Sequence, residues 1–221
     1  MIKRVTLLLI VAITGVGTLF AQDPPISQFY LNKVYLNPAY AGINRDLTFN
    51  ATIRDQWTNV PGSFRTAVLA MDVGCPRRRL GLGFVAMNNM EGEGRLRTTM
   101  GHAIVAAHIP LGKFAVASAA LKIGIGKKYI DWSRLTFTDE LDPVHGPIYP
   151  SAALPAVEKS NMIIDVGGGG LIRARWGETG SFSSAGVALS HANKPVESLL
   201  GFETPLPVRT SIHSYHHLRI T

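Results

Sequence analysis

The sequence contains a single cysteine, Cys75, among its 221 residues. One cysteine cannot form a disulfide bond within the chain, and it cannot build a cysteine-based metal site. Cys75 lies between Gly74 and Pro76, in a short segment typical of a turn. We therefore interpret it as a turn residue and not as a catalytic nucleophile.

Charged side chains are also sparse, at 17% of all residues, although the formal net charge is +7. The basic residues are scattered along the chain, and their only run is Arg77-Arg78-Arg79. Scattered charges do not form the continuous basic patch that binds nucleic acid, so we expect no nucleic-acid partner. We interpret the arginine run as a solvated turn, with lipid head groups or an acidic partner as the alternative contact.

Long hydrophobic runs are missing after residue 21. No later segment approaches the ~20 continuous apolar residues that a transmembrane helix requires. The one such run, Val5–Val16, follows Lys3 and Arg4 and precedes the small-ended sequence Leu19-Phe20-Ala21. This order predicts a cleaved signal peptide at residues 1–21, with a membrane anchor helix as the alternative. Removal of the peptide lowers the net charge to about +5.

Several later segments of the chain alternate regularly between apolar and polar residues. In the first such segment, Phe49 and Ile53 fall on one parity, whereas Asn50 and Arg54 fall on the other. A β-strand turns successive side chains to opposite faces, so the pattern predicts two-faced strands. About eight strands are predicted, at Leu47–Trp57, Phe64–Val73, Leu80–Met87, Leu96–Ile109, Phe114–Lys127, Met162–Trp176, Phe182–His191 and Val208–Ile220.

The connections between these strands differ in length. Pro110–Lys113 is a tight turn, whereas residues 131–160 form a long loop with several prolines. Short turns on one side and longer loops on the other are typical of outer-membrane barrels. We therefore predict an all-β fold, a transmembrane antiparallel β-barrel of the outer membrane. The chain would comprise the signal peptide at residues 1–21, an irregular lead-in or plug segment at residues 22–46, and barrel strands at residues 47–221.

The segment Met162–Trp176 has the clearest alternation after the long loop. Val166 falls on its apolar parity and Asp165 on its polar parity. In a barrel the apolar parity meets lipid and the polar parity lines the lumen, so we expect Val166→Arg to impair assembly and Asp165→Asn to be tolerated. The four glycines Gly167–Gly170 predict a bend, a bulge or a close backbone approach.

No catalytic constellation is evident. The sequence has no Gly-x-Ser-x-Gly elbow to hold a serine nucleophile. The loop carboxylates Asp139, Glu140 and Asp142 are interpreted as solvated, with a Ca²⁺-binding loop as the alternative. His213 and His217 share one face of a predicted strand but lie ~13 Å apart, too far for one metal ion. We predict no enzymatic activity, no cofactor and no metal site.

The start of the mature chain reads SQFYLNKVYLNPAYAG at Ser27–Gly42, with RDQW at Arg54–Trp57 and VPGSFRT at Val60–Thr66. These segments resemble the PorP/SprF family, outer-membrane β-barrel proteins of the type IX secretion and gliding-motility system of Bacteroidetes. Weaker matches follow in order at Ala106–Gly112, Lys127–Leu135, Ser190–Pro195 and Val208–Leu218. The family-motif positions that we single out are Gln28, Tyr30, Asn37, Pro38, Tyr40, Gly42, Arg54, Gln56, Trp57, Pro61 and Gly62.

The resemblance implies a non-enzymatic outer-membrane component that supports export or surface anchoring of adhesin-type proteins. Its implied partners are periplasmic ring and lipoprotein components of the secretion system, a secreted surface adhesin and outer-membrane lipid. Family members usually continue with further strands after the region that matches Val208–Leu218. We therefore expect a C-terminally truncated chain with an incomplete barrel.

Two other functions are compatible with the same alternation. One is a passive outer-membrane porin or small-solute channel, which has the same lipid-facing and lumen-facing sides. The other is a soluble, secreted β-sandwich that binds glycans or protein. Within the lead-in segment, the aromatic and apolar residues are expected to pack inward or against partner proteins, with Asn37-Pro38 fixing a turn. These residues are Phe29, Tyr30, Tyr35, Leu36 and Tyr40.

Overall fold

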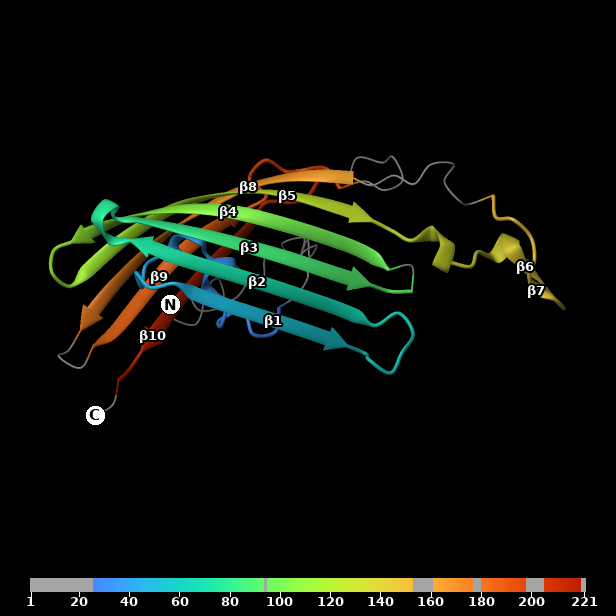
Figure 1. The fold of residues 1–221 in the computed structure, drawn as a ribbon, viewed down its shortest axis with the longest axis horizontal. Helices are drawn as coiled ribbons and strands as arrows, with labels where there is room; N and C mark the ends of the chain where they lie inside the picture. Colours follow the sequence, from blue (N-terminus) through green and yellow to red (C-terminus); the bar gives the residue numbers. More distant parts are fainter. Residues whose placement is uncertain (1–25, 94, 153–160, 177–179, 198–204, 220–221) are drawn as a thin grey trace, which may run out of the picture.

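The computed structural model describes residues 26–93, 95–152, 161–176, 180–197 and 205–219. Eight long strands form one antiparallel sheet in the order β1-β2-β3-β4-β5-β8-β9-β10, curled into a half-barrel (Figure 1). The all-β antiparallel prediction is confirmed. The β-sandwich alternative is wrong, because the eight strands lie in one sheet and not in two sheets packed face to face. The predicted signal peptide at residues 1–21 lies outside the described residues.

The strands of the sheet follow the predicted segments closely. Their bounds are β1 (Thr48–Gln56), β2 (Phe64–Cys75), β3 (Leu80–Glu91), β4 (Leu96–Leu111), β5 (Ala115–Tyr129), β8 (Asn161–Trp176), β9 (Ser181–Ser190) and β10 (Arg209–His217). A separate hairpin of β6 (Leu141–Asp142) and β7 (Gly146–Pro147) lies in the loop after β5 and projects beyond the sheet (Figure 1). The short helices are α2 (Lys33–Leu36), η1 (Pro38–Tyr40), η2 (Pro76–Arg78), η3 (Trp132–Arg134) and η4 (Thr138–Glu140).

Within the described ranges, every helix is too short or too polar to cross a membrane.

β3 is longer than the predicted strand Leu80–Met87, because it continues through the polar run Asn88–Glu91. Asn88 Nδ2 donates to Thr99 Oγ1 on β4 at 2.6 Å, and Asn89 Oδ1 accepts from Thr66 Oγ1 on β2 at 2.7 Å. Cross-strand hydrogen bonds of this kind stabilise polar positions in a sheet. The strand therefore continues where its apolar alternation ends.

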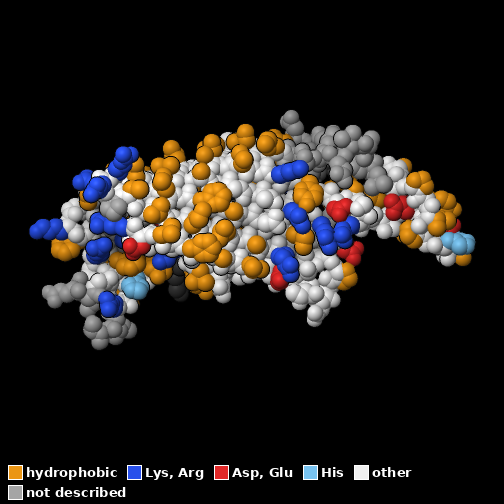
Figure 2. Space-filling model, viewed as in Figure 1, with side chains coloured by type: hydrophobic (Ala, Val, Ile, Leu, Met, Phe, Trp, Pro, Cys, Tyr) orange, Lys and Arg blue, Asp and Glu red, His pale blue; other side chains and the backbone are white. Residues whose placement is uncertain are grey.

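Apolar side chains cover the convex face of the half-barrel. Figure 2 shows hydrophobic side chains over the middle of the visible face, with basic side chains gathered towards its two ends. A soluble protein rarely exposes so large an apolar surface, whereas a membrane strand presents such residues to lipid. Exposed members of this face include Phe49, Ile53, Leu82, Phe84, Val105, Leu121, Ile123, Ile125, Ile164, Ile172 and Val187.

Residues 26–46, which we call the N-terminal segment, lie against the concave face of the sheet. Their helical turns α2 and η1 contact β2, β3, β4, β5 and β8. The hydrophobic core forms between this segment and the inward side chains of the strands. It includes Val34, Ala39, Tyr40, Ala41, Val68, Val85, Ile104, Ala106, Ala120 and Leu171. The concave side is therefore occupied by the chain's own residues.

Candidate functional site

Two asparagines determine the local conformation of the N-terminal segment. Asn32 Oδ1 accepts a hydrogen bond from the Tyr35 amide at 3.2 Å and caps α2. Asn37 Oδ1 accepts from the Ala39 amide at 2.9 Å, and Pro38 occupies the first position of η1. Asparagine caps and an early proline both favour helical turns, so the sequence itself specifies two consecutive turns here.

Asn37 also fixes the segment to the sheet. Its Nδ2 donates to the carbonyl oxygens of Gly170 on β8, at 3.1 Å, and Val187 on β9, at 3.2 Å. The same atom lies 3.0 Å from His213 Nε2 on β10. Asn37 is fully buried, so these contacts satisfy an amide that would otherwise be desolvated without partners.

Tyr40 forms a second attachment to the sheet. Its hydroxyl lies 2.9 Å from Ser184 Oγ on β9, and its ring lies 5.4 Å from the ring of His213. Burial raises the pKa of the Tyr40 hydroxyl, so this group remains neutral at physiological pH. The tyrosine therefore contributes an uncharged hydrogen bond at the bottom of the concave face.

The end of the N-terminal segment is attached to the opposite half of the concave face, at β2 and β4. The Gly42 amide donates to Asp72 Oδ2 on β2 at 2.8 Å. His108 Nε2 on β4 donates to the Ala41 carbonyl at 3.0 Å, while its Nδ1 lies 2.8 Å from Ser118 Oγ. Polar contacts to both halves of the sheet thus determine where the segment lies.

Glycines in the strands make room for this segment. A Cβ atom at Gly81 would overlap the Ala41 carbonyl oxygen, and one at Gly169 would overlap Asn37 Oδ1. β8 remains paired with β5 through Gly167–Gly170 and with β9 through Gly168–Gly170, so the predicted bulge is wrong and the close backbone approach is confirmed. The glycines are therefore part of the docking surface.

Gly81→Ala is expected to lower the free energy of unfolding by about 1–3 kcal/mol, because neither backbone can move away from the added methyl group. Gly81 is paired with both β2 and β4, and the Ala41 carbonyl is held by His108. Urea unfolding of the chain in lipid vesicles measures the loss. Faster tryptic cleavage after Lys33 would report release of the segment.

Gly101→Ala on β4 is the matched control for this substitution. A Cβ there would meet the Phe84 ring at 3.8 Å, an ordinary van der Waals contact. This variant should unfold like the unsubstituted chain. Equal stability of the Gly81 and Gly101 variants would contradict the docked position of the segment.

A buried charged cluster lies on the concave face beside the segment. The Asp165 side chain is 0% exposed, and its Oδ2 accepts from His102 Nε2 at 2.8 Å and lies 3.4 Å from Lys122 Nζ. Its Oδ1 accepts from His191 Nδ1 at 2.9 Å and from the His191 amide at 3.1 Å. Asp165 therefore lies on the inward-facing parity, as predicted, and partners surround its carboxylate on both oxygens.

The structure divides the predicted family-motif positions into groups. Asn37, Pro38, Tyr40 and Gly42 are buried together on the concave face, whereas Gln28 and Tyr30 lie exposed at the start of the segment. The second group lies at the far end of β1 and in the following loop, and consists of Arg54, Gln56, Trp57, Pro61 and Gly62. Trp57 packs edge-on against the Phe64 ring, with centroids 5.1 Å apart. The structure does not bring these two groups together.

The carboxylates of the long loop support its own turns. Asp139 accepts from Ser151 Oγ at 2.8 Å, and Glu140 accepts from the Phe137 amide at 3.2 Å. The amides of Val144 and His145 donate to Asp142 and lower the pKa of its carboxyl group. Within the described part of the chain, no cluster of three or more His, Cys, Asp or Glu side chains is arranged to hold a metal ion.

Sequence reasoning did not identify the partners of Asp165. His102, Lys122 and His191 lie on β4, on β5 and just after β9, and only the strand order brings them together. In the sequence, each of these residues has small or apolar neighbours on both sides. This pattern indicates a polar residue that points inward, but it does not indicate which residue it contacts.

Comparison with known protein families identifies a relationship. The family model described as "Type IX secretion system membrane protein PorP/SprF" matches residues 18–217. The matched range includes the N-terminal segment and all eight strands of the sheet. No curated protein and no solved structure matches the chain significantly.

Proposed function

The chain belongs to the PorP/SprF family of type IX secretion system membrane proteins, and we propose that it supports export or surface anchoring of adhesin-type proteins from the outer membrane. In this proposal it acts without catalysis. Its partners are outer-membrane lipid, the periplasmic ring and lipoprotein components of the system, and a secreted adhesin. Residues 1–21 serve as the export signal and residues 22–46 as the plug of the barrel.

The observation that carries the proposal is the contrast between the two faces of the sheet. The convex face exposes apolar side chains such as Leu121, at 74% exposure, and Ile123, at 59%. The concave face is covered by the N-terminal segment, with Asn37 and Tyr40 fully or almost fully buried. An apolar convex face and an occupied concave face support a scaffold that is embedded in lipid. Such a scaffold leaves the two ends of the sheet available for contact with other proteins.

The two ends of the sheet differ in a way that suggests which side each one faces. The turns β2–β3 and β4–β5 are short, whereas the β5–β8 connection carries the projecting β6–β7 hairpin (Figure 1). Outer-membrane barrels place short turns in the periplasm and long loops outside, so we assign the hairpin to the cell surface. Its exposed Val144, at 83%, and Ile148 are suited to contact a secreted protein.

The filled concave face also weighs against the porin alternative. Passive diffusion of solutes requires an open, water-filled lumen. Here Asn37, Tyr40 and Gly42 bond directly to strands on both sides of the trough. Solute passage along this face would first require release of the segment.

Deletion of the gene in its native host tests the proposal. We expect the surface adhesin to disappear from immunolabelled cells while solute uptake remains intact, and re-expression of the chain to restore surface display. Normal surface display with reduced uptake would instead favour the porin. Recovery of the chain in the periplasm or medium without detergent would contradict the membrane location.

A further inference from the structure

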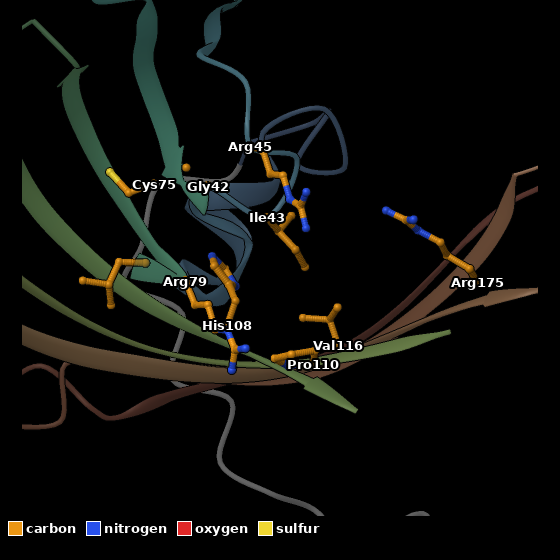
Figure 3. A pocket seen from close by; sticks show the side chains of 11 residues that line it. Gly42, Ile43, Arg45, Cys75, Arg79, His108, Pro110, Val116 and Arg175 are labelled. Atoms are coloured by element: carbon orange, nitrogen blue, oxygen red, sulfur yellow. The ribbon is translucent and has the colours of Figure 1, made fainter. Parts of the chain in front are cut away.

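A cavity of about 280 Å³ lies at the short-turn end of the sheet, between the end of the N-terminal segment and the strands (Figure 3). Three arginines from separate parts of the chain line it: Arg45 at the end of the N-terminal segment, Arg79 in the β2–β3 turn and Arg175 near the end of β8. Figure 3 shows the guanidinium groups of Arg45 and Arg175 facing one another across the cavity. The cavity is therefore surrounded by positive charge from different parts of the chain.

No acidic residue is among the described residues that line the cavity. Within the described ranges, none of the three guanidinium groups has a carboxylate within ion-pair distance. Asp72, the acidic residue bonded to the end of the segment, already accepts from the Gly42 amide. Like charges gathered without a counter-charge favour a bound anion.

The backbones of the three arginines are fixed although their side chains have no such partner. The Arg79 carbonyl accepts from the His108 amide at 2.8 Å, and the Arg175 amide donates to the Phe114 carbonyl at 2.7 Å. Arg45 and Arg79 have φ angles of 69° and 54°, in the left-handed region that favours glycine. Non-glycine residues held in this region concentrate at functional sites.

The chemistry of guanidinium groups determines what the cavity can accept. Their planar forks bind carboxylate or phosphate groups through paired hydrogen bonds. Ile43 and Val116 supply apolar walls beside the arginines, which suit the methylene groups of an acidic side chain. A free inorganic anion would leave these walls without a contact.

The position of the cavity separates a protein ligand from a lipid head group. His108 points to the concave face, where it bonds to Ala41 and Ser118. Lipid, in contrast, contacts the convex face, where Leu121 and Ile123 are exposed. A protein that approaches the short-turn end therefore has access to the cavity, whereas lipid on the convex face does not.

We propose that this arginine pocket binds a carboxylate-bearing peptide segment of a periplasmic partner protein. The proposal rests on the proposed function, because that function places the short-turn end in the periplasm. With a volume near the lower limit of ~300–1,000 Å³ for small-ligand sites, the pocket accepts one short acidic segment and not a whole domain.

Binding of a fluorescein-labelled peptide of alternating glutamate and serine tests the proposal. The full chain is held in nanodiscs of zwitterionic lipid, and fluorescence polarisation measures the Kd. The double variant Arg79→Gln/Arg175→Gln is expected to weaken binding by about ten-fold or more, since each lost arginine removes charge-assisted hydrogen bonds. A peptide with glutamine in place of glutamate should not bind.

Arg77→Gln is the matched control, because Arg77 is exposed in the same turn and does not line the cavity. It should leave the Kd within about two-fold of the unsubstituted value, as for a solvent-screened charge. Equal losses in the Arg77 and the double variants, or no binding by the unsubstituted chain, would overturn the proposal. So would inorganic phosphate or anionic-lipid nanodiscs that compete as well as the acidic peptide does. Because this assay needs no cells, its failure is distinguishable from a failure of the deletion experiment.

Discussion

Asp165→Ala is expected to destabilise the folded chain by about 3–5 kcal/mol, because it removes one partner from a buried set of charged and polar groups. The two histidines would lose the carboxylate that accepts their hydrogen bonds, and Lys122 would lose its ion pair with that carboxylate. Removal of one partner from a buried ion pair is far more costly than loss of an exposed pair. Urea unfolding in lipid vesicles, followed by tryptophan fluorescence, measures the change.

Two further variants make this result interpretable. Asp55→Ala removes an exposed carboxylate whose pair with Arg65 is largely solvated, so it should cost less than about 1 kcal/mol. Asp165→Asn keeps the side-chain shape but removes the charge opposite Lys122, so it should fall between the other two variants. If Asp165→Ala were as stable as Asp55→Ala, the burial of Asp165 among charged and polar partners would be contradicted.

The alternation of single residues predicted the strands and their faces because this information is local. In β8, Ile164 and Ile172 lie on the exposed face and Asp165 on the buried one, as their parity requires. The identity of Asp165's partners is not local information. His102 reaches it only because β4, β5 and β8 are neighbours and because the sheet curls inward.

The glycines of β8 illustrate how tertiary contacts resolve an ambiguous local signal. A run of four glycines inside a strand predicts a bend, a bulge or a close backbone approach, and the strand by itself does not distinguish among them. Gly169 accommodates the side chain of Asn37, which lies far away in the sequence. The turn at Asn37-Pro38 could be predicted from its residue types. Its docking onto β8, β9 and β10 could not, because those contacts depend on the assembled sheet.

Leu121→Arg is expected to destabilise the chain in a lipid bilayer by about 2–4 kcal/mol, because it places a cation near the midplane of the lipid-facing surface. Leu121 is 74% exposed and pairs with Val105 and Gly168 near the middle of their strands. An arginine there cannot easily extend its guanidinium group to the head groups on either side. Urea unfolding in vesicles gives the change in the free energy of unfolding.

Leu111→Arg provides the matched control on the same face. Leu111 is the last residue of β4, at the short-turn end, where we expect a strand to leave the hydrocarbon core. The same substitution should therefore cost only about 0–1 kcal/mol there. A larger destabilisation at Leu121 than at Leu111 is expected for a bilayer with a low-dielectric centre. Crowding of arginine on a protein surface would not produce this difference. Equal costs at the two positions would contradict the assignment of the convex face to lipid. Val166→Arg on β8, which pairs with Ile123 two residues from Leu121, should cost about as much as Leu121→Arg.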